Sequence, residues 1–137
     1  MTEAELIRIV VSFLTGGLAG AALTAVVNAL RQKTELAFKV LEQYFARLQP
    51  ISDAIGVLET PGSLKDPPSH NKVTSIGDWY EMVATLYQNR VINRKLLDKV
   101  GIVGQMRRFL NLCKLANTGG DLDAALKAWT GLAAATR

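Results

Sequence analysis

The sequence predicts an all-α protein in which an N-terminal transmembrane helix continues into a small cytosolic helical bundle of about four helices. Apolar residues recur at helical spacings along most of the chain, and no segment alternates polar and apolar residues for long enough to indicate a strand. A long uncharged stretch near the amino terminus predicts the anchor. We therefore divide the chain into a membrane anchor, residues 1–33, and a cytosolic helical domain, residues 34–137, with a loop at 59–72.

The predicted anchor is the segment from Ile9 to Leu30, whose 22 residues carry no formal charge. A helix of this length is about 33 Å long, which is enough to cross a hydrocarbon core of about 30 Å. The hydroxyl groups within it can bond to the carbonyl groups of their own helix, so they are tolerated in lipid. We therefore expect a single membrane span.

Two alternative interpretations of this segment are weaker. A cleaved export signal needs a basic start, whereas this chain begins with MTEAELIR, and the apolar run continues past the small residues 19–22. A helix buried in a soluble bundle is the stronger rival. A soluble helix this long normally carries a stripe of Lys and Glu, and the segment has none.

Flanking charge predicts the orientation of the span. Arg31, Lys33 and Lys39 follow it, while Arg8 precedes it. Basic residues remain on the cytoplasmic side of a membrane. The expected location is therefore the bacterial inner membrane, with a single pass, the amino terminus outside and the C-terminal domain in the cytoplasm.

Small and polar residues recur every four positions along the span, and this spacing places them on one slowly winding face of a helix. Small residues allow two membrane helices to approach closely, and an amide side chain can bond across the contact. We expect this face to contact a membrane-protein partner or a second copy of the chain. Its members are Ser12, Gly16, Gly20, Thr24 and Asn28.

The span is expected to run without a break into the next helix, forming one rod from about residue 4 to 48. A short helix from Ile51 to Leu58 is then expected, with Pro50 at its first turn, because proline suits that position. The apolar face expected for the second half of the rod consists of Leu36, Val40, Leu41, Tyr44, Phe45 and Leu48.

Helical spacing resumes after the predicted loop, with Thr74 or Ser75 as the expected N-cap. Asn93 is expected to cap the next segment, which Gly101 and Gly104 leave as either one helix or two. A final helix is expected after the turn NTGGD, with Asp121 as its cap.

Composition excludes several classes of function. The net charge is +4 without a run of five like charges, which is unlike a nucleic-acid-binding surface. One cysteine, Cys113, and one histidine, His70, allow neither an internal disulfide nor a Cys/His zinc site. Because the chain has no phosphate loop and no nucleophile elbow, we expect no catalytic residues, cofactor, metal or small-molecule substrate.

The stretch DWYE, residues 78–81, is the strongest candidate site in the predicted domain. Asp78 and Glu81 share a helix face, and Glu81 lies beside the apolar stripe, where a carboxylate requires a cation or hydrogen-bond donors. The candidate cations are Arg107 and Arg108. We expect the site residues Trp79, Tyr80, Glu81 and Arg107 to shape the cytosolic domain. Glu81 is expected to form a structural ion pair with one of the two arginines, and the alternative is that it binds a partner.

The order of these parts resembles a known family. An apolar span is followed by a basic helix, a linker, the segment WYEMVATLYQNRVINRKLL at 79–97, and ALKAW at 125–129. This order is similar to that of small bacterial single-span membrane proteins catalogued as a domain of unknown function. Their motif has Asn where this chain has Asp78. The resemblance implies a membrane-anchored helical domain and no activity.

The sequence therefore favours a membrane-anchored, non-enzymatic accessory or scaffold subunit that binds protein partners through its span and its helical domain. Its expected partners are membrane lipid and a membrane protein or a second copy, with no nucleic acid. An alternative hypothesis is an oligomerising membrane-active effector, such as a phage-defence or lysis protein. A soluble α-bundle enzyme is a third.

Overall fold

A computed structural model describes residues 2–8 and 19–137, and every regular element among them is helical, which confirms the all-α class. Residues 3–8 form a short helical segment. The labelled elements are α2 (Ala19–Ala46), α3 (Leu48–Glu59), the 3-10 helix η1 (Ser63–Lys65), α4 (Pro67–Gln88), α5 (Arg94–Val100), α6 (Ile102–Ala116), α7 (Asp123–Ala128) and α8 (Thr130–Ala135).

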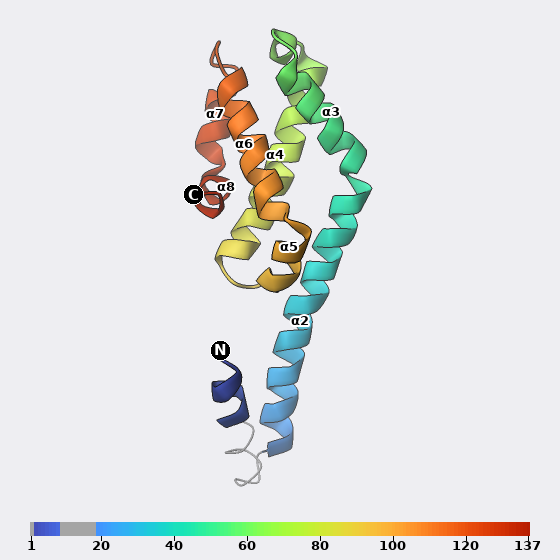
Figure 1. Ribbon diagram of the computed structural model, residues 1–137, viewed down its shortest axis with the longest axis vertical. Helices are drawn as coiled ribbons and strands as arrows, with labels where there is room; N and C mark the ends of the chain where they lie inside the picture. The colour runs from blue at the N-terminus through green and yellow to red at the C-terminus, as the bar shows by residue number, and fades with distance from the viewer. Residues whose placement is uncertain (1, 9–18) are drawn as a thin grey trace.

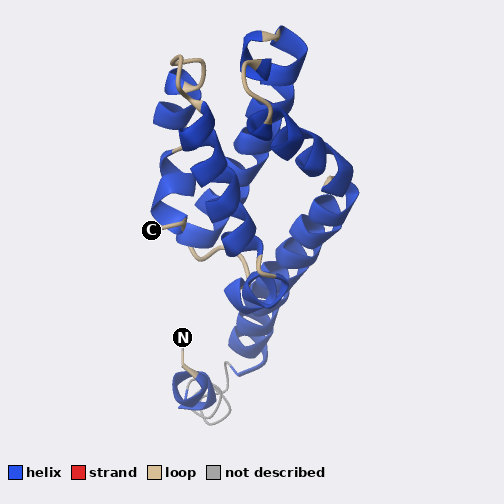
Figure 2. Ribbon diagram, turned by 45° about the horizontal axis from the view of Figure 1, so that its top comes forward, coloured by secondary structure: helices blue, strands red, loops and turns tan. Residues whose placement is uncertain are grey.

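The helices after α2 form an antiparallel bundle around α4 (Figure 1). Helix α4 runs back along α3, α6 runs back along α4, and α7 and α8 return beside α6. Helix α2 packs against this bundle with its carboxyl-terminal half, while its amino-terminal half extends beyond it (Figures 1 and 2). The expectation of about four helices was too low, because two of the predicted segments are each divided.

The bend between α2 and α3 has a local cause. Pro50 has no N–H to donate to the carbonyl of Ala46, and its ring clashes with that carbonyl. Helix α2 therefore ends at Ala46, and α3 begins at Leu48 after Arg47 leaves the helical conformation. The short helix predicted from Ile51 to Leu58 is present and begins three residues earlier.

The predicted loop at 59–72 is wrong for most of its length. Residues 63–65 form η1, and α4 begins at Pro67, so residues 67–72 are helical. Two prolines at the first positions of α4 start the helix, since their fixed φ is already helical. The N-cap is consequently Asp66 instead of Thr74 or Ser75.

Of the two alternatives left open for residues 93–117, the structure shows two helices, which are divided at Gly101, while Gly104 lies within α6. Gly101 has φ 75° and separates α5 from α6, in a left-handed conformation that favours glycine. The Asn93 side chain caps α5 by accepting a bond from the Leu96 amide at 3.4 Å, as predicted. The last predicted helix is two helices that meet at Trp129, and its N-cap is Leu122 instead of Asp121.

The hydrophobic core lies between α3, α4, α6 and the segment from α7 to α8. Its largest fully buried side chains include Trp129, Tyr80 and Phe109. Helix α2 contributes Ala37 and Val40 to the buried core, among the residues whose burial the structure describes. Farther toward its amino terminus, α2 is bonded to the bundle through the Lys33 carbonyl, which accepts a hydrogen bond from the Asn93 amide at 3.1 Å.

None of the helices within residues 2–8 and 19–137 is both long and apolar enough to cross a bilayer. Residues 9–18 of the predicted span lie outside the described residues, as does the continuity of the rod predicted from residue 4. Helix α2 runs without a break through the predicted boundary between residues 33 and 34.

Candidate functional site

The DWYE stretch lies in the middle of α4, and its two carboxylates point toward the junction of α7 and α8. The Trp129 indole donates to Asp78 Oδ1 at 2.9 Å. The amides of Gly131 and Leu132 donate to the Glu81 carboxylate at 2.8 and 2.6 Å. We call these five residues the α4–α8 clasp. Asp78 and Glu81 share a face, as the sequence predicted.

Glu81 acts as an N-cap for a helix about 50 residues away in the chain. The first amides of a helix have no partner within that helix, and they carry the positive end of its dipole. Because α8 begins at Thr130, Gly131 and Leu132 supply two of these amides. A carboxylate is a better acceptor for these two amides than a hydroxyl, since hydrogen bonds to charged groups are stronger.

Two glycines allow the clasp to close. A Cβ atom on Gly77 would lie 2.0 Å from Cζ2 of Trp129, so the indole ring rests directly on the backbone of α4. A Cβ atom on Gly131 would lie 2.9 Å from Oε1 of Glu81 and 2.7 Å from the Thr85 hydroxyl. Both positions therefore require glycine because of close approach.

The expected ion pair between Glu81 and Arg107 is not among the ion pairs of the described residues. Arg107 is exposed, and its Nε donates to the Thr136 carbonyl at 3.1 Å, near the end of α8. The described ion pair is Arg108 with Glu59 at 3.9 Å, and both of its side chains are more than half exposed. Exposed pairs of this kind contribute little to stability.

Trp79 and Tyr80 are buried inside the domain instead of forming a surface for a partner. The Trp79 indole donates to Gln43 Oε1 at 2.9 Å and stacks on Tyr44, which joins α4 to α2. Tyr80 is fully buried, and desolvation raises its pKa. Ring contacts continue through Phe109 to Trp129, so aromatic side chains connect α2 with the carboxyl-terminal segment.

The predicted helix–helix contact in the membrane is only partly described. Ser12 and Gly16 lie outside the described residues. Gly20 lies in the first turn of α2, and Thr24 and Asn28 are exposed farther along the same helix. The contact through these residues stays a prediction.

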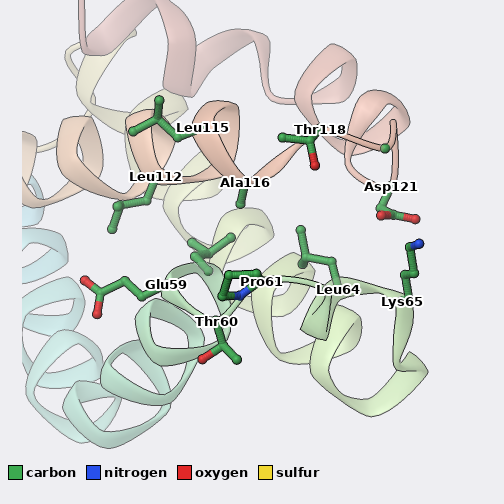
Figure 3. Close-up of a pocket in the computed structure, with 13 residues that line it drawn as sticks. Glu59, Thr60, Pro61, Leu64, Lys65, Leu112, Leu115, Ala116, Thr118 and Asp121 are labelled. Carbon is green, nitrogen blue, oxygen red and sulfur yellow. The ribbon is translucent and has the colours of Figure 1, made fainter.

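A cleft of about 480 Å³ lies between the α3–η1 corner and the end of α6 (Figure 3). Leu58, Leu64 and Leu112 give it apolar walls, while Glu59 and Asp121 carry acidic groups at its edge. The sequence gives no sign of this cleft, because its two sides come from segments that are far apart in the chain. Among the described residues, no group of three His, Cys, Asp or Glu side chains is placed to hold a metal ion.

Cys113 is buried in α6, and desolvation raises its pKa to about 12. The thiolate is the reactive form of cysteine. We expect a thiol reagent at about pH 8 to leave Cys113 unmodified in the folded chain and to modify it fully in denaturant. Mass spectrometry measures the modified fraction, and a chain carrying the exposed Lys39→Cys substitution is the control. Equal labelling rates at the two positions would contradict the burial of Cys113.

Sequence reasoning missed Gly77, Trp129 and Gly131 as parts of one site. A weak signal was present, since the resemblance rests on two short motifs, one around Glu81 and the other ending at Trp129. The structure brings these two motifs into contact.

This contact assigns no activity to the chain. Comparisons with protein-family models, with curated protein sequences and with solved structures find no match to this chain.

Proposed function

We propose that the chain is a non-enzymatic accessory or scaffold subunit of a bacterial inner-membrane assembly. The uncharged segment from Ile9 to Leu30 anchors it in the bilayer. The helical domain stands on the cytoplasmic side and binds protein partners.

The observation that carries this proposal is the exposure of two apolar side chains, Val27 and Leu30, in the part of α2 that extends beyond the bundle. Val27 and Leu30 are each 46% exposed, and they precede Lys33, whose carbonyl accepts a bond from the Asn93 amide of the bundle. Exposed apolar surface is unfavourable in water by about 25 cal/mol per Å². Side chains of this kind, next to an uncharged segment long enough to span a bilayer, are favoured in contact with lipid or with another membrane helix.

The charge pattern around this part of α2 supports the orientation. Arg31, Lys33 and Lys39 are exposed immediately after the uncharged segment. Such residues interact favourably with the anionic lipid headgroups of the cytoplasmic leaflet. The amino terminus then lies outside and the domain lies inside the cell.

The hydrogen bonds and burial of the side chains that could carry chemistry support a non-enzymatic role. Asp78 and Glu81 hold the carboxyl-terminal segment, and Arg107 bonds to a backbone carbonyl at the end of α8. Cys113 is buried, with a raised pKa. These groups are accounted for by the folding of the domain.

Carbonate extraction of membranes from cells that produce the full chain tests the anchor. We expect the native chain to stay in the membrane pellet. The double substitution Leu18→Arg and Ala21→Arg should release it, since two arginines near the middle of a span disfavour insertion by about 6 kcal/mol. Immunoblotting of pellet and supernatant measures the released fraction.

The matched control places two arginines on the exposed surface of the domain, through Met82→Arg and Leu115→Arg. This variant should remain in the pellet with the native chain. Release of the native chain itself by carbonate would overturn the anchor and the proposed function with it.

A further inference from the structure

The positive charge of the chain is concentrated at one end of the helical domain. Residues 30–39 of α2 and residues 89–100, from the end of α4 through α5, carry seven of the 16 basic and two of the 12 acidic side chains. The rest of the chain carries nine basic and ten acidic side chains, so these two segments account for the whole net charge of +4. A surface of this kind attracts a polyanionic partner.

Asn93 holds the two segments side by side. Its backbone amide donates to the Lys33 carbonyl at 3.1 Å, and its side-chain amide donates to the Thr34 hydroxyl at 3.3 Å. Helix α5 and the turn before it form the end of the bundle from which the amino-terminal half of α2 extends (Figure 1). We call the exposed basic side chains at this end the basic end of the domain, which consists of Arg31, Lys33, Arg90, Lys95 and Lys99.

The packing of α5 directs its lysines away from the bundle. Leu97 is buried in the core, whereas Lys95 and Lys99, four positions apart, lie together on the opposite face of the helix. Asp98, the acidic residue of α5, accepts a hydrogen bond from the Tyr87 hydroxyl at 2.8 Å. Among the described residues, no member of the basic end takes part in an ion pair, so its charge is available to an external anion.

Exposed aliphatic side chains at the same end favour lipid as the partner. Val91, in the turn before α5, is 45% exposed, and Val100, at the end of α5, is 36% exposed. Val27 and Leu30 are exposed on the adjoining part of α2. The interface of an anionic bilayer binds surfaces that combine basic groups with apolar side chains, because the phosphates attract the charges and the acyl boundary accepts the apolar groups.

Nucleic acid fits this end less well. Proteins that bind single strands combine basic grooves with exposed aromatic rings on which the bases stack. At the corner between α4 and α5 the aromatic ring is that of Tyr87, and one of its faces already carries the Arg94 guanidinium, 4.4 Å from the ring centroid. The Arg94 Nε also donates to the Tyr87 carbonyl at 2.8 Å, which holds the guanidinium in place.

The basic end also lies at the level of lipid headgroups. This step rests on the proposed anchor, in which the span ends at Leu30, whereas the charge and exposure of the surface do not depend on it. Asn93 bonds to α2 at Lys33 and Thr34, three and four residues beyond Leu30, which is a rise of about 5–6 Å. The headgroup layer on each side of a bilayer is about 5–8 Å thick. The lysines of α5 can therefore reach the lipid phosphates.

We propose that the basic end binds the helical domain to anionic lipid headgroups, with Arg90, Lys95 and Lys99 supplying contacts that the anchor does not provide. The corner between α4 and α5 then rests on the membrane surface. The opposite end of the bundle, which carries the cleft between α3, η1 and α6, points away from the lipid (Figure 1).

Energy transfer in vesicles that contain the full chain tests this contact. A donor dye on Gln88→Cys, an exposed position beside the basic end, reports its distance from acceptor dyes on the lipid headgroups. We expect more transfer in vesicles with about 30% phosphatidylglycerol than in pure phosphatidylcholine. Salt at about 1 M should abolish the difference, because it shortens the Debye length to about 3 Å. A donor on Thr118→Cys, at the far end, should show little transfer in either, and the buried Cys113 does not interfere.

A variant that removes three charges identifies the residues responsible. Arg90→Gln, Lys95→Gln and Lys99→Gln together should lower the ratio of lipid-bound to free domain in the anionic vesicles roughly a hundredfold. The reason is that each basic residue near such a surface strengthens binding about fivefold. The transfer from the Gln88→Cys donor measures this ratio.

The matched control removes the same charge elsewhere on the domain, through the exposed positions Lys65→Gln, Lys114→Gln and Lys127→Gln. This variant should leave the transfer unchanged, which separates a local contact from a general effect of net charge. Both variants should keep the native circular dichroism, because the changed side chains lie outside the core. Equal loss of transfer in the two variants would overturn the assignment of the contact to the basic end.

The outcomes separate the lipid contact from the anchor. A chain that resists carbonate but gives equal transfer in both kinds of vesicle overturns the lipid contact and leaves the anchor standing. A chain that carbonate releases overturns the anchor, and the lipid contact then survives only if the chain sediments with anionic vesicles and not with neutral ones. Displacement from anionic vesicles by RNA at an equal concentration of phosphate overturns the lipid contact in favour of a nucleic-acid surface.

Discussion

We expect Gly77→Ala to lower the free energy of unfolding by about 3 kcal/mol or more. The added Cβ atom would lie 2.0 Å from Cζ2 of Trp129 and 2.3 Å from its Cη2. The indole ring is 1% exposed and holds Asp78 through its Nε1, so it cannot move aside without losing that bond and its packing. Urea denaturation followed by circular dichroism measures the change.

A loss of stability on Gly77→Ala is informative, because it is opposite in sign to the usual effect of this substitution in a helix. In a helix interior, alanine is normally favoured over glycine by about 1 kcal/mol. Gly56, in α3, is the matched control, because it is exposed and a Cβ atom there would have no neighbour within 4 Å. Gly56→Ala should stabilise the chain by about 0.5–1 kcal/mol. A gain of stability at Gly77 as well would contradict the contact between Trp129 and the α4 backbone.

A double-mutant cycle isolates the contact itself. Trp129→Leu alone should cost about 2–4 kcal/mol, since it removes a fully buried aromatic ring and its bond to Asp78. With the ring gone, Gly77→Ala should cost much less than it does in the native chain. The difference between the two values is the coupling energy of the pair, which we expect to be about 2 kcal/mol.

Residue spacing predicted the presence of the helices better than their ends. Gly101 was a correct sign of a division, because a left-handed residue after α5 favours glycine. Pro67 and Pro68 were misleading, since proline both ends helices and begins them. The sequence around these prolines does not show whether they end a helix or begin one. The predicted loop therefore included residues 67–72, which belong to α4.

The apolar face of α2 shows a second limit of sequence patterns. The sequence predicted a single face that includes Val40, Phe45 and Leu48. In the structure Val40 is buried, whereas Phe45 and Leu48 are exposed. Periodicity reports that a helix has an apolar side, but it does not report which part of that side the chain's own core covers.

The partner of Glu81 was the main error in the predicted site. The sequence predicted an arginine as the partner of Glu81, because a half-buried carboxylate requires a cation or a hydrogen-bond donor. The donors are the backbone amides of Gly131 and Leu132. Every residue except proline carries such an amide, so these donors leave no side-chain signature. Only the path of the chain brings them to α4.

We expect Glu81→Ala to lower the free energy of unfolding by about 2–4 kcal/mol. The substitution leaves two amides of α8 without their acceptor and removes the negative charge from its amino-terminal end. Hydrogen exchange should accelerate at Gly131 and Leu132 first, while the amides in the middle of α4 keep their protection. Glu42→Ala, which removes an exposed carboxylate from α2, should change stability by less than about 0.5 kcal/mol.

The same measurement distinguishes the clasp from the ion pair that the sequence favoured. If Glu81 were held by Arg107, then Arg107→Ala would destabilise the chain about as much as Glu81→Ala, and the two substitutions would be strongly coupled. In the structure Arg107 bonds to the Thr136 carbonyl, so its loss should cost about 1 kcal/mol or less, and its effect should add to that of Glu81→Ala. Additive effects would therefore show that the donors to Glu81 are backbone amides of α8, whereas a coupling near 2 kcal/mol would restore the ion pair.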